Sequence, residues 1–429
     1  MIGDSLSISD FTSIAAKLGA HRILFKTLAA NDNSKNQIYL GSSFDVVQIL
    51  PLGAINADPR KPDLLKASLA LSWIDDEGRL SPAPDAQLIL YPQYPEVRFS
   101  GFLRGSAGAP SALLNQHARI PGRVLALALA RDRVYARVFA PRSRIAAELD
   151  SSALPYLSVF RVLDTSDGRS RLLTRLREIH EKGWIEGKLM RTDGTVVRHV
   201  SPNSGGTTLE AEFGIAANSN AKPDFEGWEI KAHASSGSSR LTLMTPEPTG
   251  GFYREAGAKE FVQRFGHTSP ETPDRIDFSG TFRSGVRQLS GLTLLLTGFD
   301  SLTLRFEPTG AVELRTDAGE VAASWAFAAL LNHWTRKHDQ ASYVPYDKDS
   351  STNLKFRYGP MVRLGTRTDF TRFLSAMARG TVIYDPGLNI KNILKGRPVV
   401  KMRSQFRTSI AALDRLYETF EIIDVRTSR

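Results

Sequence analysis

The spacing of apolar residues changes once along this chain, near residue 165. Before that point, short apolar or alternating runs such as RILFKTLAA, AQLILYP and RVLALALA are separated by turn-rich pieces such as NDNSKN and DDEGRLSPAPD. Many short strands at this spacing predict a mainly-β domain that closes wholly or partly into a barrel. One early helix is predicted over Ile8–Leu18, with Ser9 or Asp10 as its N-cap.

After residue 165, helical and strand patterns are mixed. The first helix is indicated by apolar residues at helical spacing, which are Leu172, Leu173, Leu176 and Ile179. Further helices are predicted at TTLEAEFGI, AGAKEFVQRFG, VAASWAFAALLNHWTRKH and IAALDRLYETF, and strands at WEIK and RLTLMTP. Trp325 and Trp334 are interpreted as core residues of the long helix. This mixture indicates an α/β domain, so we predict a mainly-β domain over residues 1–165 and an α/β domain over residues 166–429.

The composition excludes several classes of protein. Cysteine is absent, which rules out disulfide frameworks, thiol catalysis and cysteine-ligated zinc. No apolar run is long enough to span a membrane, and MIGDSLSISDF lacks the features of a secretory signal, so we expect a cytoplasmic protein without membrane contact. Neither a G-x-S-x-G elbow nor a G-x-x-x-x-G-K-[ST] loop occurs. His333 and His338 are five apart, which misses zinc-helix spacing, so we interpret them as surface or DNA-facing residues.

The net charge of +10 is unevenly distributed. Residues 355–429 carry about nine of these ten excess positive charges. A one-sided basic region is typical of a protein that binds a polyanion such as nucleic acid. A basic face that serves only solubility is the alternative.

Two acidic residues and a lysine lie close together in the segment KPDFEGWEIKAH. If WEIK is a strand, Glu229 and Lys231 share one face, while Trp228 and Ile230 share the other. Asp224 precedes a glycine at which the chain can turn back beside Glu229. Two adjacent carboxylates repel unless a cation lies between them, and Mg²⁺ prefers oxygen ligands. Lys231 could then orient or deprotonate a water in metal-assisted phosphodiester hydrolysis. The pattern is short, and a surface strand with an ion pair is the alternative.

The longer stretch GGTTLEAEFGIAANSNAKPDFEGWEIKA resembles the catalytic core of the MvaI/BcnI restriction endonucleases and of the related MutH-type nickases, which are PD-(D/E)xK nucleases. GWIEGKLMRTDGT, TGGFYREAGAKEF and RSQFRTSIAALDRLYETFEIID resemble the family in the same order, over about residues 170–425. The resemblance implies Mg²⁺-dependent cleavage of duplex DNA, with Asp224 and Glu229 as metal ligands. Lys231 would be the catalytic lysine and Glu210 an auxiliary acid. Glu212 departs from the family pattern, and we expect it to be exposed to solvent on another face of the helix.

Arg403 and Arg407 in RSQFR are four residues apart, so on a helix or tight turn they could approach one surface. The same region of the MvaI-like family contacts guanines, so the resemblance implies this role for both arginines. Phosphate contact or simple solvation is the alternative.

The first domain resembles the DNA-binding β-pseudobarrel of EcoRII-type N-terminal domains over about residues 20–145. KTLAANDNSKNQIYLG is similar to the first DNA-binding arm, and YPQYPEVRFSGFLRG is similar to the second. The resemblance implies DNA contacts by Asn31, Asn33, Lys35 and Gln37 in the first arm, and by Gln93, Tyr94, Glu96, Arg98 and Arg104 in the second. An ordinary β-domain with polar loops is the alternative.

Together, the resemblances imply a type II restriction endonuclease that uses Mg²⁺ to cut double-stranded DNA at a short GC-rich pseudopalindrome such as CCWGG or CCSGG. They further imply a monomer that could hold two DNA sites at once and a cognate DNA methyltransferase in the same system. A strand-specific nickase and a non-catalytic DNA-binding regulator are the alternatives.

Overall fold

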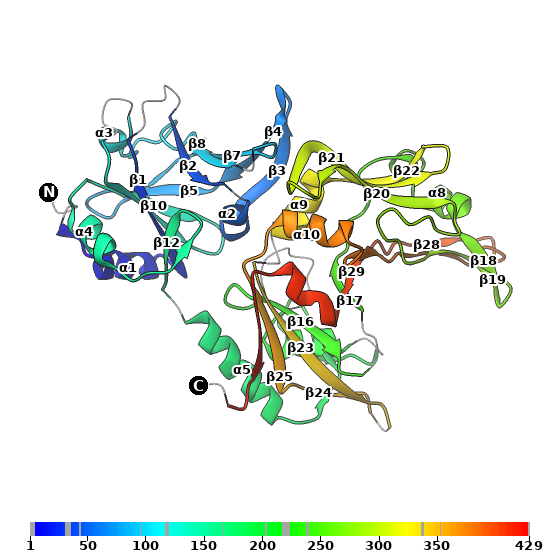
Figure 1. Cartoon of the computed structure of the whole chain (residues 1–429). Coiled ribbons are helices and arrows are strands. Elements are labelled where there is room, and N and C mark those ends of the chain that lie inside the picture. The colour runs from blue at the N-terminus through cyan, green and yellow to red at the C-terminus, as the bar shows by residue number, and fades with distance from the viewer. Residues whose placement is uncertain are drawn as a thin grey trace. The chain divides into compact units, whose positions relative to one another are not determined.

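The computed structural model describes residues 5–30, 36–42, 44–94, 96–115, 120–165, 167–201, 204–216, 224–236, 240–335, 339–351 and 353–427. The chain divides into two compact units, Met1–Asp167 and Gly168–Arg429 (Figure 1). We call these unit 1 and unit 2 and treat each by itself. Within the described ranges, no helix has both the length and the apolar character needed to cross a membrane.

Unit 1 begins with helix α1 (Ile8–Lys17), close to the predicted bounds. Its N-cap is Ser7, so the prediction of Ser9 or Asp10 at this position is wrong. The Ser7 hydroxyl accepts a hydrogen bond from the backbone N–H of Asp10 at 3.0 Å, and the Asp10 carboxylate accepts one from the backbone N–H of Ser7 at 2.9 Å. This reciprocal capping box satisfies two N–H groups that would otherwise lack partners, which is why the helix begins where it does.

The strands of unit 1 form two sheets, and β10 and β5 are the only parallel neighbours among the described residues of this unit. The first sheet has the order β11-β12-β1-β9-β10-β5-β6, with bounds Tyr156–Leu157, Phe160–Asp164, Arg22–Leu28, Arg123–Leu129, Val134–Phe139, Leu71–Ile74 and Leu80–Pro82. The second has the order β2-β8-β7-β4-β3, with bounds Gln37–Gly41, Glu96–Ser100, Gln87–Tyr91, Lys61–Leu69 and Leu52–Asp58. Three short helices are α2 (Asp45–Ile49), α3 (Ser111–Leu114) and α4 (Arg144–Ser151). The unit is therefore mainly β, as predicted.

The first sheet of unit 1 is covered on one face by α1 and α4. Phe11 of α1 and Ile145 of α4 belong to one buried apolar cluster with Phe25 and Ala126 of the central strands. Every residue of β9 is buried, because this strand lies between β1 and β10 and is covered on both faces.

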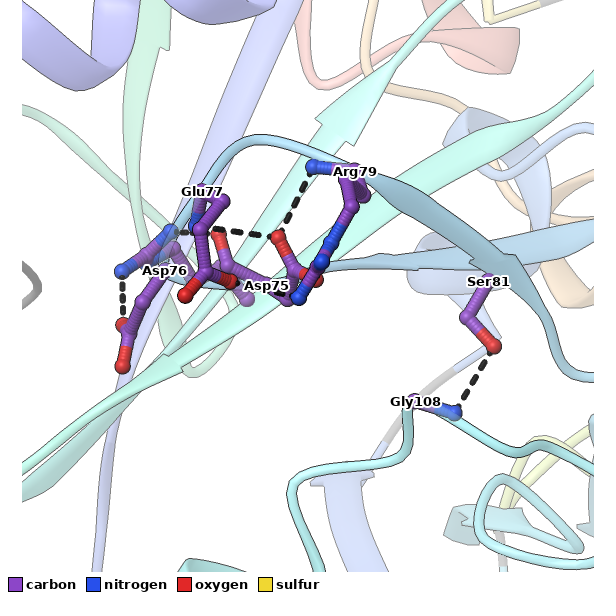
Figure 2. A network of polar contacts seen from close by, with 7 residues as sticks. Asp75, Asp76, Glu77, Arg79, Ser81 and Gly108 are labelled. Carbon is purple, nitrogen blue, oxygen red and sulfur yellow. Dashed lines mark hydrogen bonds and ion pairs between the residues drawn. The ribbon is translucent and has the colours of Figure 1, made fainter.

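An acidic turn joins β5 to β6 (Figure 2). One oxygen of the Asp75 carboxylate accepts the backbone N–H groups of Glu77 and Arg79, at 3.0 and 2.8 Å. The other lies 2.7 Å from Nε of Arg79, and the Asp76 carboxylate accepts a hydrogen bond from Arg137 at 2.6 Å. These carboxylates stabilise the turn in the manner of an Asx motif. The run of acidic residues therefore has a structural role, and no bound ligand is needed to explain it.

Unit 2 is built around a mixed sheet in the order β13-β24-β23-β25-β30, and β16 pairs with β23 in parallel. The bounds of these six strands are Ile185–Glu186, Lys355–Tyr358, Gln340–Asp349, Met361–Thr366, Thr419–Asp424 and Glu229–Ala234. The predicted first helix is confirmed as α5 (Gly168–Glu181), and its four apolar residues are buried. They pack in one cluster with Leu209 of α6 (Gly205–Glu212) and with Ile230 and Val344 of the sheet.

The rest of unit 2 consists of smaller sheets and short helices. The sheet orders are β17-β29-β26, β18-β19-β27-β28, β20-β21-β22 and β14-β15. Their strands have the bounds Arg240–Met244, Phe406–Ser409 and Ile383–Tyr384; His267–Ser269, Thr272–Ser279, Gly387–Lys391 and Val399–Lys401; Leu292–Asp300, Arg305–Thr316 and Val321–Ala326; Lys188–Met190 and Val196–Arg198. The helices are α7 (Phe252–Ala256), α8 (Ala258–Phe265), α9 (Phe327–Thr335) and α10 (Phe370–Ala378).

The long helix predicted over VAASWAFAALLNHWTRKH is wrong in its first third. Val321–Ala326 is strand β22, Phe327–Thr335 is helix α9, and residues 336–338 lie outside the described residues. Trp325 lies opposite Val312 of β21, and this pairing outweighs the helix preference of the alanines around it. Trp325 and Trp334 are both fully buried, which confirms them as core residues. The final predicted helix is a 3₁₀ helix, η3 (Ile410–Leu416), and the residues after it form β30.

Candidate active site

A tight turn precedes strand β16. Glu226 and Gly227 have positive φ angles of 50° and 86°, and the backbone N–H of Trp228 donates to the carbonyl of Phe225 at 2.7 Å. Two consecutive residues with positive φ make the two-residue hairpin turn in which glycine is favoured at the second position. The turn is closed by the backbone N–H of Asp224, which donates to the carbonyl of Trp228 at 3.0 Å.

The turn places Asp224 against the start of β16. Its carboxylate oxygen Oδ2 accepts a hydrogen bond from the backbone N–H of Ile230 at 2.9 Å. The neighbouring Glu229 is the first residue of the strand and is 3% exposed. The two carboxylates predicted as metal ligands therefore flank the same backbone segment.

Lys231 lies on the same face of β16 as Glu229, because side chains alternate along a strand. Its Nζ is 3.1 Å from Oε1 of Glu229, and both side chains are largely shielded from solvent. Trp228 and Ile230 belong to the buried cluster on the other side, so the predicted alternation is confirmed. A lysine held this close to a buried carboxylate has little freedom to adopt other rotamers.

Glu210 comes to the same place on helix α6. The helix starts close to the central sheet: a Cβ added to Gly205 would lie only 2.6 Å from the ring of Tyr346 of β23. The hydroxyl of Tyr358 donates to the carbonyl of Gly205 at 2.7 Å, which fixes this end of the helix. Only glycine permits so close an approach. Glu210 is half-buried and lines the same cleft as Glu229.

The cleft has a volume of about 700 Å³. Charged and polar side chains from α6, β16, β17 and β29 face it: Glu210, Glu229, Lys231, His233, Arg240 and Arg407. Carboxylates, a lysine and arginines thus converge from segments that are up to 197 residues apart in sequence. The arrangement can hold a cation at the acidic end and an anion at the basic end.

Arg407 is held in the cleft by Asp385. Nη1 of Arg407 donates to Oδ2 of Asp385 at 2.8 Å, and Arg240 donates to the same oxygen at 3.2 Å. Nη2 of Arg407 also donates to the backbone carbonyl of Arg240 at 2.5 Å. Sequence analysis missed Arg240 and Asp385, and no local pattern could have found them, because their partners are distant in the chain.

Arg403 lies elsewhere. It is exposed, stands over Gly387 and does not line the cleft. The expectation of a helix or tight turn at RSQFR is wrong, because Phe406–Ser409 is strand β29, paired with β17. At about 3.3 Å per residue, an extended chain separates Arg403 and Arg407 by roughly 13 Å.

His233 is a further cleft residue that sequence analysis missed. It follows Glu229 by four positions on the same face of β16 and is 8% exposed. Burial lowers the pKa of His233, and the charge of Arg363 lowers it further. The side chain is therefore neutral at pH 7, and the period-two alternation of the strand could have revealed its position.

Glu212 is buried, so the expectation that it faces solvent is wrong. Its carboxylate forms ion pairs with Lys182, at 2.6 Å, and with Lys188, at 2.5 Å. These lysines follow α5 and begin β14, two elements that pack beside α6. Glu212 thus anchors the end of the helix whose other side carries Glu210.

The Glu212 ion pairs predict a pH-dependent stability. Burial raises the pKa of Glu212, but hydrogen bonds from the two lysines outweigh this and leave the pKa below its ordinary value of 4.5. A lowered pKa in the folded state stabilises the protein above the unfolded pKa, and this contribution disappears as the pH falls through the folded value. We expect Glu212→Gln to lower the free energy of unfolding by about 1–3 kcal/mol at pH 7, with a smaller difference below pH 4.

Urea unfolding of the wild type and of Glu212→Gln, at pH 7 and at about pH 3.5, measures the difference in their free energies of unfolding. Glu178→Gln is the matched control, because Glu178 is half-exposed and its ion pair with Arg175 should contribute little. An equal loss for Glu212→Gln at both pH values would contradict the assignment.

Carboxylate oxygens are the ligands that Mg²⁺ prefers, and Asp224 and Glu229 supply them at one place. The donor set therefore fits this ion, which usually keeps several water ligands as well. In the part of the chain that the structure describes, no group of three or more histidine, aspartate or glutamate side chains is placed to hold a metal.

Of the DNA-contacting residues predicted in unit 1, Asn31, Asn33 and Lys35 lie outside the described residues. Strands β2 and β8 bring Gln37, Glu96 and Arg98 together. Arg98 donates to Oε1 of Gln37 at 3.2 Å and forms a short ion pair with Glu96.

The other predicted residues of the second arm lie at turns. Gln93 and Tyr94 follow β7 and are exposed, Tyr94 to 68%. Arg104 has an exposed side chain whose Nε is 3.8 Å from Asp85. Gln37 and Arg104 line an open pocket of about 450 Å³.

The model of the MvaI/BcnI restriction endonuclease family matches residues 173–417. The chain belongs to this family. The matched range contains Glu210, Asp224, Glu229, Lys231 and Arg407 and accounts for most of unit 2. Family membership supports a type II restriction enzyme, that is, a DNA endonuclease with a restriction-endonuclease fold in the C-terminal region.

Two solved structures similar to this chain are described as "Restriction endonuclease MvaI-cognate DNA substrate complex" and "Restriction endonuclease MvaI in the absence of DNA". Each is 17% identical to this chain, and each comparison covers 60% of this chain and 98% of the other. The TM-scores are 0.47 and 0.34. No curated protein matches the chain.

Proposed function

We propose that this protein is a Mg²⁺-dependent type II restriction endonuclease that cuts both strands of duplex DNA at a short GC-rich pseudopalindrome such as CCWGG or CCSGG. One observation carries the proposal. Glu229 and Lys231 are paired on one face of β16, and Asp224 is hydrogen-bonded to the backbone between them. This geometry supports the proposed PD-(D/E)xK site, as does membership of a family of restriction endonucleases.

Asp224 and Glu229 would hold the cation. When bound, Mg²⁺ supplies charge neutralisation at the phosphate and lowers the pKa of a water. Lys231, 3.1 Å from Glu229, would orient an attacking water or accept its proton, and Glu210, which reaches the cleft from α6, would serve as an auxiliary acid. The low exposure of Glu229 and Lys231 keeps bulk water out, which strengthens each electrostatic interaction.

The arginines at the basic end of the cleft would bind the DNA. Arg407 lines the cleft and its side chain is 25% exposed, so it is proposed as a guanine reader or a phosphate contact. Arg403 is exposed and outside the cleft, and a guanine contact by Arg403 would lie farther along the duplex.

Residues 1–165 are proposed as an EcoRII-type pseudobarrel that binds DNA. The proximity of Gln37, Glu96 and Arg98 supports this, since a paired arginine and amide can read base edges. Gln93, Tyr94 and Arg104 would add contacts from the neighbouring turns. The protein would then act as a monomer that holds two DNA sites, beside a cognate methyltransferase that protects host DNA.

Cleavage of a complex DNA, followed by run-off sequencing of the ends, tests the proposal. We expect Mg²⁺-dependent linear products whose ends share one short sequence, and the same experiment gives the cleavage position. Nicked circles as the final product would favour a strand-specific nickase instead. Metal-dependent binding without any cleavage across varied sequences would overturn the nuclease assignment.

A further inference from the structure

A basic hairpin lies beside the cleft of unit 2. Strands β27 and β28 form it, and we call residues 391–403 the basic hairpin. This segment contains no acidic residue, and its basic residues are all exposed: Lys391, Lys395, Arg397, Lys401 and Arg403. The structure therefore concentrates five positive charges on one short element.

None of these five side chains forms an ion pair within the residues that the structure describes. The arginines of the cleft differ in this respect, because Arg240 and Arg407 both form ion pairs with Asp385. Elsewhere in unit 2, exposed arginines such as Arg287 also have a carboxylate partner. Unneutralised cations repel one another, and a polyanion would relieve that repulsion.

Exposed apolar side chains occur among these cations. Leu394, Val399 and Met402 are exposed to 74%, 56% and 60%. A surface that served only solubility would gain nothing from exposing them, whereas a surface covered by a partner would bury them. The combination indicates a contact surface.

The hairpin is continuous with the strand that carries Arg407, because β28 leads along the chain into β29 (Figure 1). Asn389 pairs with Lys401, the backbone N–H of Gly387 donates to the carbonyl of Arg403 at 2.9 Å, and that of Asp385 donates to Gln405 at 2.8 Å. The ladder therefore runs without a break from Lys391 to Asp385, the residue that holds Arg407. At about 3.3 Å per residue it spans roughly 20 Å, over half a helical turn of duplex DNA.

We propose that the basic hairpin, through Lys391, Lys395, Arg397 and Lys401, is a sequence-independent clamp that binds the phosphates of duplex DNA adjacent to the segment in the cleft. The proposal rests on the proposed nuclease function, because DNA in the cleft would lie along the ladder. Each cation that contacts a phosphate releases a counterion, which makes affinity depend on salt. An anionic membrane would also suit a basic surface with apolar residues, but the continuity with the cleft favours DNA.

The test is the salt dependence of DNA affinity for Lys395→Ala/Arg397→Ala, measured in EDTA with two unrelated 30-base-pair duplexes. Both residues lie in the turn between β27 and β28, so the fold should be retained. We expect the plot of log affinity against log salt to become less steep by about 1.8, on both duplexes, since each phosphate contact contributes about 0.9. Lys395→Arg/Arg397→Lys should keep the wild-type slope.

Lys17→Ala/Arg191→Ala is the matched control, because these exposed cations lie outside the cleft and the hairpin. It removes the same two positive charges as Lys395→Ala/Arg397→Ala. A wild-type slope for Lys395→Ala/Arg397→Ala would overturn the clamp, as would a change confined to one duplex. Binding to phosphatidylserine vesicles that is lost in this variant while the DNA slope is unchanged would assign the hairpin to membranes. If the wild-type protein cleaves DNA, any of these results contradicts the clamp alone. Absence of cleavage by the wild type contradicts the proposed function instead.

Discussion

Replacing Lys231 by alanine should lower the rate of DNA cleavage about a thousandfold, while DNA binding changes little. Lys231 is positioned by its contact with Glu229 on the strand that also adjoins Asp224, so no neighbouring lysine of β16 can substitute for it. Its side chain is 15% exposed, which means that its loss removes a positioned group and not a mobile surface charge.

Single-turnover cleavage in Mg²⁺ and DNA binding in EDTA separate the two effects. Lys348→Ala is the control, since Lys348 is an exposed lysine of the adjacent strand β23 that does not line the cleft. Cleavage by Lys231→Ala at the wild-type rate would remove Lys231 from the mechanism. A loss of binding as large as the loss of cleavage would instead make it a DNA-contact residue.

Replacing Trp325 by alanine should lower the free energy of unfolding of unit 2 by about 3–5 kcal/mol. The ring is fully buried, with its centroid 4.6 Å from that of Tyr384 and 5.4 Å from that of Phe406. Its Nε1–H also donates to the carbonyl of Pro246 at 3.0 Å, and this carbonyl would lose that partner.

Urea unfolding of the whole chain measures the loss, with Trp184→Ala as the control. Trp184 is 42% exposed and contacts Arg357 through its ring, so its removal should cost about 1 kcal/mol or less. A loss below about 1 kcal/mol for Trp325→Ala would show that the site collapses without a cavity. Because Phe406 precedes Arg407, we also expect the variant to weaken DNA binding.

Local patterns predicted the elements that depend on few neighbours. The leucines of α5 recur at helical spacing, and all of them are buried. The alternation in WEIK assigned Glu229 and Lys231 to one face, because side chains alternate in any strand. The glycine after Glu226 indicated a turn, and the positive φ at Gly227 is the conformation that glycine adopts readily.

Two of the wrong predictions, a helix over Val321–Ala326 and an exposed Glu212, share one physical cause. Val321–Ala326 contains helix-favouring alanines, yet it pairs with β21 because Trp325 is buried opposite Val312. Glu212 is charged, yet it is buried because Lys182 and Lys188 neutralise it from two other elements. In the first place a tertiary contact outweighed a helix propensity of a few tenths of a kcal/mol per residue. In the second, the two lysines compensate for the burial of a charge, which otherwise costs several kcal/mol.

The sequence by itself determined the candidate catalytic segment, because a turn and a short strand suffice to bring Asp224, Glu229 and Lys231 together. Only the tertiary structure decided the basic end of the cleft. Arg407 meets Asp385 and Arg240 across 22 and 167 residues of chain, and Arg403 does not line the cleft. Contacts over such distances depend on which strands pair, and strand pairing is a property of the whole fold that a local pattern does not contain.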